Sequence, residues 1–292
     1  MGAPFIARGH MTAPLEPEIL SDTIRYLEQQ QARNVRYLPI QPDLLEGWQT
    51  AGASPAQAKP ATAPFKPAPS SPLPSRAPMT PERRAAFEDL RARARACTKC
   101  PHLVSFRKQV VFGVGNPDAE IMFVGEAPGA DEDLQGEPFV GKAGQLLTKM
   151  IQAMGLQRSD VYIGNVLKCR PNVDTASGNR KPTPEEMETC LPWLKEQIKL
   201  IQPRVLIAEG DTAVKGLVPG LKDGITRLRG KWLEFEGIPL MPTFHPAYLL
   251  RNQSLAIKRQ CWEDLLAVME KLQMAISDKQ RNFFLSSISG RS

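Results

Sequence analysis

Residues 120–147 read EIMFVGEAPGADEDLQGEPFVGKAGQLL and contain, in order, a strand pattern, a loop and the start of a helix. The first six residues form a short apolar run that ends in glycine, which predicts a buried strand. An acidic, glycine-rich segment follows, and a helical pattern covers about residues 143–154. A strand followed by a loop and a helix is the unit that α/β proteins repeat.

Three further apolar runs have the same character, and helical patterns separate them. The runs cover residues 161–166, 204–208 and 238–243, and the helical patterns cover about residues 184–201, 211–218 and 254–272. An earlier helix begins with Thr80 as its N-cap and Pro81 as its first residue. The alternation predicts an α/β fold whose parallel sheet has helices on both faces, with ligands bound just after the strands.

The N-terminal part of the chain has a different composition. Residues 51–81 consist mostly of Pro, Ala and Ser, which offer little apolar surface for a core. We expect residues 1–80 to be a disordered extension and linker, in which residues 17–34 have the apolar spacing of a short amphipathic helix. The extension would recruit a protein partner or tether the protein. Residues 81–273 would form the folded domain, and residues 274–292 a C-terminal tail.

The charge and the apolar pattern limit the class of protein. The formal net charge of +6 suits a polyanionic partner, although many soluble proteins carry a similar charge. No run of 18 apolar residues predicts a membrane span, and no basic segment followed by an apolar run opens the chain. We therefore expect a cytoplasmic protein without a membrane segment, and a monomer.

Five cysteines in a reducing compartment favour metal or cluster ligation over disulfides. Cys97 and Cys100 form a CTKC motif, Cys169 follows the second predicted strand, and Cys190 lies in the helix at residues 184–201. Four thiolates can hold zinc or a 4Fe-4S cluster, and their spacing does not separate these two. Cys261 lies in the apolar pattern of the last helix and is interpreted as a buried hydrophobic residue.

Several motifs occur together in a fixed order: CTKC, GEAPG, PFVGKAGQLL, NVLKCRP and FHPAYLLR. Taken together, from about residue 97 to residue 272, they resemble the family 4 uracil-DNA glycosylases, the iron-sulfur branch of the uracil-DNA glycosylase superfamily. The resemblance implies a three-layer fold with a central four-stranded parallel sheet, and a structural 4Fe-4S cluster. Its ligands would be Cys97, Cys100, Cys169 and Cys190. Residues 171–182 are a few residues longer than the usual turn of the family.

The resemblance also implies an activity, the excision of uracil from DNA in base excision repair, and roles for individual residues. Asn165 would read the edge of a flipped uracil with one donor and one acceptor, and Phe139 would stack on the ring. Alone, Asn165 could satisfy a strand end and Phe139 could be a core aromatic. His245 would donate a hydrogen bond to uracil O2 as negative charge develops there, and a neutral ring suffices for this. The backbone at Ala127 would contact the base.

The family pattern offers Glu126 and Glu132 for the sugar side of the reaction, with Asp131 nearby. Ala127 stands where the best-known branch of the superfamily has an aspartate, so we expect Glu132 to position water and Glu126 to shape the loop.

The loop after His245 would contact the DNA. Leu249 and Leu250 form an apolar wedge, although one of the two is expected in the core, and Arg251 would hold phosphate. Further candidates for phosphate contacts are Lys142, Lys168, Arg170 and Arg180.

Two other functions are compatible with the sequence. The chain could bind or trap uracil-DNA without turnover, but the direct run from GEAPGADED to PFVGK lacks the basic, His-containing insertion of the DNA-trapping branch. It could also be a zinc-stabilised DNA-binding module. The sequence does not separate single-stranded from duplex substrates.

Overall fold

The computed structural model describes residues 78–171 and 180–285. The predicted N-terminal extension and linker, up to residue 77, and the helix expected near residues 17–34 lie outside the described residues. So do residues 172–179 of the long turn and residues 286–292 of the expected tail.

A six-stranded sheet in the order β1-β3-β2-β4-β6-β5 forms the centre of the fold. The four predicted runs form its parallel core: β3 (Tyr162–Asn165), β2 (Ile121–Gly125), β4 (Val205–Glu209) and β6 (Ile238–Thr243). This confirms the predicted parallel sheet. Two short antiparallel strands, β1 (Val114–Gly115) and β5 (Leu233–Phe235), extend it at the edges. The turn Glu236-Gly237, where both φ angles are positive (48° and 82°), joins β5 to β6.

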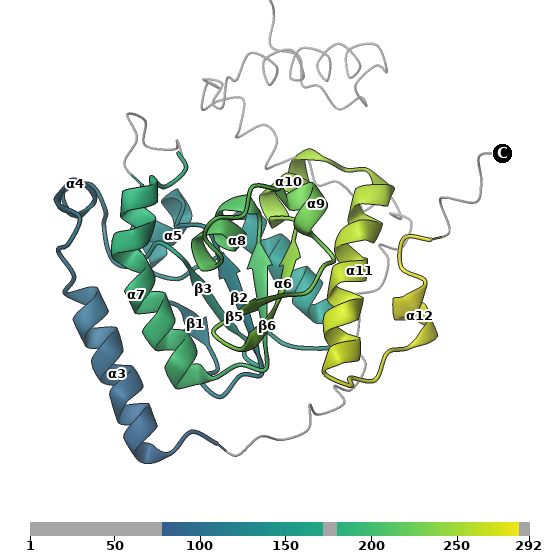
Figure 1. Ribbon diagram of the computed structural model, residues 1–292, viewed down its shortest axis with the longest axis horizontal. Helices are drawn as coiled ribbons and strands as arrows, with labels where there is room; N and C mark the ends of the chain where they lie inside the picture. Colours follow the sequence, from purple (N-terminus) through teal and green to yellow (C-terminus); the bar gives the residue numbers. More distant parts are fainter. Residues whose placement is uncertain (1–77, 172–179, 286–292) are drawn as a thin grey trace, which may run out of the picture. The chain divides into compact units, whose positions relative to one another are not determined.

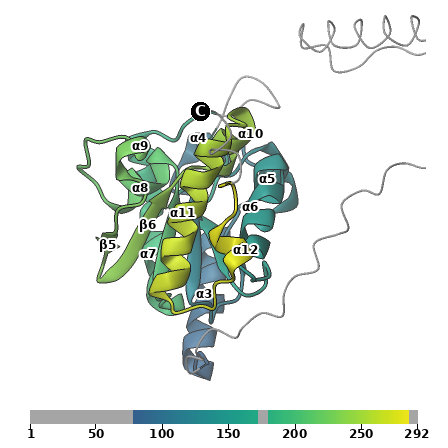
Figure 2. The ribbon, with the colours of Figure 1, turned by 90° about the vertical axis from the view of Figure 1, so that its right-hand side faces the viewer.

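Helices cover both faces of this sheet (Figure 1), as expected for a three-layer α/β fold. Side chains alternate along β2, so that Met122 and Val124 join one core cluster, whereas Ile121 and Phe123 join the other. The first cluster lies against α3 (Pro81–Arg95), α7 (Pro184–Ile201) and α8 (Asp211–Leu217). The second lies against α6 (Lys142–Ala153) and α11 (Leu255–Lys271), and Figure 2 shows α11 from outside.

The remaining helices are short. They are α4 (Pro101–Val104), α5 (Ala130–Gln135), α9 (Ile225–Leu228), α10 (Pro246–Arg251) and α12 (Asp278–Arg281). The predicted start of α3 is confirmed, because the Thr80 side chain accepts a hydrogen bond from the Arg83 amide at 3.3 Å. In the described part of the chain, no helix combines the length and apolar character that a membrane crossing needs.

The folded part continues past the boundary expected at residue 273. The indole of Trp262 donates to the carbonyl of Gln280 at 2.6 Å and its ring packs on Phe283 at 5.2 Å, while the Gln280 side chain donates to the Ala153 carbonyl at 2.9 Å. These contacts dock α12 against α11 and α6. The neighbouring Cys261 is buried, as predicted.

Candidate active site at the carboxyl ends of the strands

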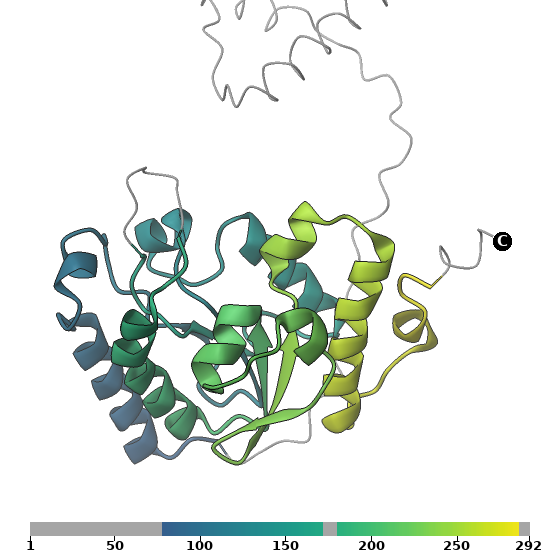
Figure 3. The ribbon, with the colours of Figure 1, turned by 45° about the horizontal axis from the view of Figure 1, so that its top comes forward.

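A pocket of about 540 Å³ lies where the parallel strands end. The helices α5 and α10 lie near this edge of the sheet in Figure 1, and Figure 3 brings the edge forward. The lining of the pocket includes seven of the nine residues predicted for catalysis, substrate binding or DNA binding: Glu126, Ala127, Glu132, Phe139, Asn165, His245 and Arg251. The strand-end rule therefore located the pocket, since these residues follow three different strands.

Phe139 adopts an unusual backbone conformation at the pocket wall, with φ of 55°. Its ring stacks on the His245 ring, with centroids 5.6 Å apart and an interplanar angle of 29°. Two glycines make room for it. A Cβ at Gly144 would lie 1.7 Å from the Phe139 carbonyl oxygen, and one at Gly125 would lie 2.6 Å from its ring. A strained aromatic residue held in this way is typical of a functional site.

Asn165 ends β3 and is 2% exposed. Its side-chain oxygen is buried and accepts no hydrogen bond from the described residues. A Cβ at Gly125 would lie 2.4 Å from that oxygen, so the glycine is also needed here. Because a buried acceptor without a partner is costly, Asn165 is a candidate to bind a donor that enters the pocket.

Lys168 is buried beneath this strand end rather than exposed to bind phosphate. Its ammonium donates to the Asn165 carbonyl at 2.9 Å and to the Gln197 side chain at 2.5 Å. Burial lowers the pKa of Lys168 to about 8, against the opposing influence of Cys190 and Cys169. The expectation of a phosphate contact is wrong for Lys168, and also for Arg170, which is buried over the Phe106 ring.

His245 is the N-cap of α10, and its Nδ1 accepts a hydrogen bond from the Ala247 amide at 3.0 Å. The ring proton therefore resides on Nε2, which is left to donate. Burial, together with the positive charge of Arg251, lowers the pKa of His245 to about 4. The imidazole is thus neutral at neutral pH and available as a hydrogen-bond donor.

The carboxylates of the first loop differ in their contacts. Glu132 accepts hydrogen bonds from the amides of Gly129 (3.1 Å), Val140 (3.0 Å) and Gly141 (3.0 Å). These bonds tie the start of α5 to the segment that carries Phe139. The half-buried carboxylate of Glu126 has no hydrogen-bond or ion-pair partner among the described residues. Asp131 is exposed and does not line the pocket. The geometry therefore favours Glu132 as the residue that shapes the loop.

The two leucines after His245 have different environments. Leu249 is 4% exposed and belongs to the core behind α6 and α11, so it is not available for contact with DNA. Leu250 is 39% exposed. Arg251 is exposed at the pocket, and its guanidinium has no partner in the described ranges 78–171 and 180–285. Of the two leucines expected to form the wedge, only Leu250 is exposed.

Sequence reasoning missed Asp211, Thr212 and Lys181, which also line the pocket. Asp211 follows β4, and one of its oxygens accepts from Lys215 at 2.9 Å, while the other is buried and has no partner in the described chain. The rule that ligands bind after strands could have found Asp211.

The four cysteines of the predicted cluster line one small cavity, and Leu103, Leu167 and Trp193 are among its apolar neighbours. Arg107 donates to the sulfur of Cys169 at 2.9 Å, and the Lys168 amide donates to the sulfur of Cys190 at 3.2 Å. All five cysteines of the chain are free thiols. Burial raises the pKa of Cys190 to about 12. Two buried thiols with sulfur-directed donors, next to the half-buried Cys97 and Cys100, match the requirements of a thiolate-ligated group, since metal binding removes the thiol protons.

A parallel sheet with this polar pocket at its strand ends places the chain among α/β proteins that bind a small ligand at that edge. The model of the Uracil DNA glycosylase superfamily matches residues 112–266, which include every residue that lines the pocket. The type-4 uracil-DNA glycosylase of Thermotoga maritima is 46% identical over 63% of this chain and 93% of its own length. The enzymes of the same name from Archaeoglobus fulgidus (44%; 58% and 86%) and Sulfurisphaera tokodaii (40%; 67% and 87%) are also similar. The chain therefore belongs to the uracil-DNA glycosylase superfamily and, within it, to the type-4 family.

Proposed function

We propose that this chain excises uracil from DNA by hydrolysing the N-glycosidic bond, and that the pocket at the strand ends is its active site. The observation that supports this most directly is the convergence of Asn165, Phe139 and His245 on that pocket. A base inside a duplex is unreachable, so the uracil nucleotide enters the pocket by flipping out of the stack.

Asn165 reads the base in this proposal. Its free side-chain oxygen accepts from N3–H of uracil and its amide nitrogen donates to O4, whereas the amino group of cytosine would meet a donor. The Phe139 ring stacks on the base, a contact worth roughly 1–3 kcal/mol. The backbone beside Ala127 forms another part of the wall.

Bond cleavage builds negative charge on uracil and positive charge on the sugar. The Nε2–H of neutral His245 donates to O2 of the departing base, a role whose loss commonly costs about 10²–10³ in rate. Glu126 positions the water that attacks C1′, because its carboxylate has no partner in the described chain. The roles expected for Glu126 and Glu132 are thus exchanged. The C1′–N1 bond breaks and its electron pair leaves with uracil as the water oxygen bonds to C1′. The water proton passes to the Glu126 carboxylate and from there to solvent, and the departing uracil anion takes up a proton from solvent.

Leu250 fills the gap left by the flipped nucleotide, and Arg251 holds an adjacent phosphate, since both side chains are exposed next to the pocket. We place the activity in the part of the chain that follows residue 80. We propose that this part acts as a monomer in the cytoplasm, where five free thiols would persist, and that the N-terminal extension serves a protein partner.

We further propose a 4Fe-4S cluster held by Cys97, Cys100, Cys169 and Cys190. In the described part of the chain, no three His, Cys, Asp or Glu side chains are arranged around a single metal ion, yet these four surround one cavity. Four cysteine thiolates suit either zinc or a 4Fe-4S cluster, and the similarity to the type-4 enzymes favours the cluster. The cluster, when bound, supplies a structural cross-link between α4, α7 and the segment after β3.

The test uses full-length protein and a labelled duplex with one uracil, resolved under denaturing conditions with and without alkali. Multiple-turnover formation of an alkali-labile abasic site is expected. A slow-migrating protein–DNA adduct without turnover would support a trapping protein instead. The absence of both the abasic site and the adduct would overturn the proposal. Iron and sulfide analysis of the same preparation distinguishes the cluster from zinc.

A further inference from the structure

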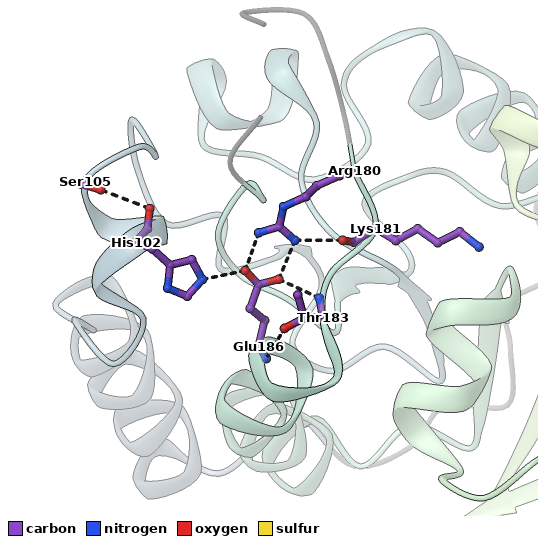
Figure 4. A network of polar contacts seen from close by, with 6 residues as sticks. All are labelled: His102, Ser105, Arg180, Lys181, Thr183 and Glu186. Carbon is purple, nitrogen blue, oxygen red and sulfur yellow. Dashed lines mark hydrogen bonds and ion pairs between the residues drawn. The ribbon is translucent and has the colours of Figure 1, made fainter. Parts of the chain in front are cut away.

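Glu186, at the start of α7, connects two segments that are far apart in the sequence (Figure 4). It is 2% exposed. Arg180 donates to both of its oxygens, at 2.8 and 2.5 Å, and the Thr183 amide donates to one of them at 2.8 Å. His102, just after the CTKC motif, lies 2.7 Å from the other oxygen. The carboxylate thus ties the cysteine-bearing segment to residues 180–183.

This arrangement keeps Glu186 ionised and occupies Arg180. Burial alone would raise the pKa of Glu186, but the hydrogen bonds from Arg180, Thr183 and His102 outweigh it and lower the pKa to about 2. A bidentate pair with a buried carboxylate holds the guanidinium in one orientation. Arg180 was one of the residues expected to bind phosphate, and its charge is instead directed at Glu186.

Lys181 follows Arg180 in the sequence, but its side chain lies in a different environment. The Arg180 guanidinium also donates to the Lys181 carbonyl at 2.9 Å, and the buried Pro182 follows, so the backbone is held on both sides. The Lys181 side chain is exposed and lines the pocket. Its ammonium makes no hydrogen bond or ion pair with the residues that the structure describes. Figure 4 shows this side chain directed away from Glu186.

We propose that Lys181 binds a backbone phosphate next to the flipped nucleotide, and that Glu186, through Arg180, positions Lys181 for that contact. Lys181 and Arg251 reach the pocket from different elements, and both are exposed cations without a protein partner in the described chain. Two such cations provide the charge that two phosphates of a bound strand require. This inference rests on the proposed function, since the flipped nucleotide defines the pocket.

The experiment measures the affinity of full-length, cluster-loaded protein for a duplex with a non-hydrolysable abasic-site analogue, over a series of KCl concentrations. Each phosphate contact contributes about 0.9 to the slope of log K against log salt for duplex DNA. Lys181→Gln should reduce the slope by about that amount, and Lys181→Arg should restore it. Lys199→Gln is the matched control, because Lys199 is exposed in the last turn of α7, at the opposite end of the helix from the pocket.

Arg180→Gln separates positioning from direct contact. It should lower the melting temperature, because Glu186 loses its bidentate partner, and it should also reduce the salt slope, because Lys181 is no longer held beside the phosphate. The double variant Arg180→Gln/Lys181→Gln should show no further reduction beyond Lys181→Gln, whereas additive reductions would mean that Arg180 itself contacts phosphate. A wild-type slope for Lys181→Gln would overturn the phosphate contact, and a wild-type slope for Arg180→Gln would overturn the positioning role of Arg180 and Glu186. Uracil release by the wild type, measured in parallel, tests the proposed function separately. Failure of the proposed uracil excision is therefore distinguishable from failure of the Lys181 phosphate contact.

Discussion

Replacement of Glu132 by Gln tests whether this carboxylate shapes the loop or positions water. Gln retains an oxygen for the Val140 and Gly141 amides, but its NH₂ group would face the Gly129 amide, so one of three hydrogen bonds is lost. Hydrogen bonds to a charged group contribute about 1.5–3 kcal/mol and those to a neutral group about 1 kcal/mol. With an allowance for solvent at this half-buried site, we expect a loss of about 2–3 kcal/mol in the free energy of unfolding.

In a domain of this size, that loss corresponds to a fall in melting temperature of about 5–10 °C. Glu126→Gln is the paired variant. Since Glu126 has no partner in the described chain, the Glu126→Gln variant should melt at the same temperature as the wild type, while its single-turnover rate falls by about 10²–10⁴. Calorimetry and rapid-quench assays on both variants supply the two readouts. If Glu132→Gln unfolds like the wild type yet loses as much rate as Glu126→Gln, the reasoning is refuted and Glu132 is the residue that positions water.

Three further predictions concern the same pocket. With the pKa of His245 near 4, the single-turnover rate should show no inflection near pH 6.5. Between pH 4 and pH 6.5 the folded state binds fewer protons than the unfolded state. The contribution of the neutral ring to stability is therefore complete above pH 6.5 and is lost as the pH falls towards 4. Gly144→Ala should displace Phe139 and reduce kcat/KM by about 10-fold or more, whereas Gly224→Ala, where a Cβ meets nothing within 4 Å, should be silent in the same assay. Lys168→Met should lower the free energy of unfolding by about 2–5 kcal/mol in denaturant titrations, because two buried acceptors lose their donor; an unchanged midpoint would contradict this.

The periodicity of the sequence predicted the core of the fold because buried parallel strands and amphipathic helices leave strong local patterns. The pattern over residues 184–201 matches α7 residue for residue, since Thr183 and Pro184 mark its start. The strand β1 has only two residues, and β5 has three, with burial that does not alternate, so neither leaves a readable signal. The helix α12 is held by the Trp262 indole and the Ala153 carbonyl, which are distant in sequence.

The pocket residues were predictable where a motif ends a strand, and their environments were not. Lys168 lies in the NVLKCRP motif close to Arg170, where a lysine is expected to be exposed. Its burial depends on Gln197, which is 29 positions away. The division between Leu249 and Leu250 depends on which face α10 turns to the core. Lys181 was missed because an exposed lysine has no local signature, and only its position beside the pocket distinguishes it.

The central claim is that this pocket excises uracil with a neutral His245 as donor to the departing base. The measurement that tests it most directly is the single-turnover rate of uracil release from a uracil-containing duplex, for the wild type and His245→Ala. We expect efficient release by the wild type and a fall of about 10²–10³ in the variant, with unchanged iron content and circular dichroism. An equal rate in the two proteins would contradict the account, as would no release of uracil by the wild type.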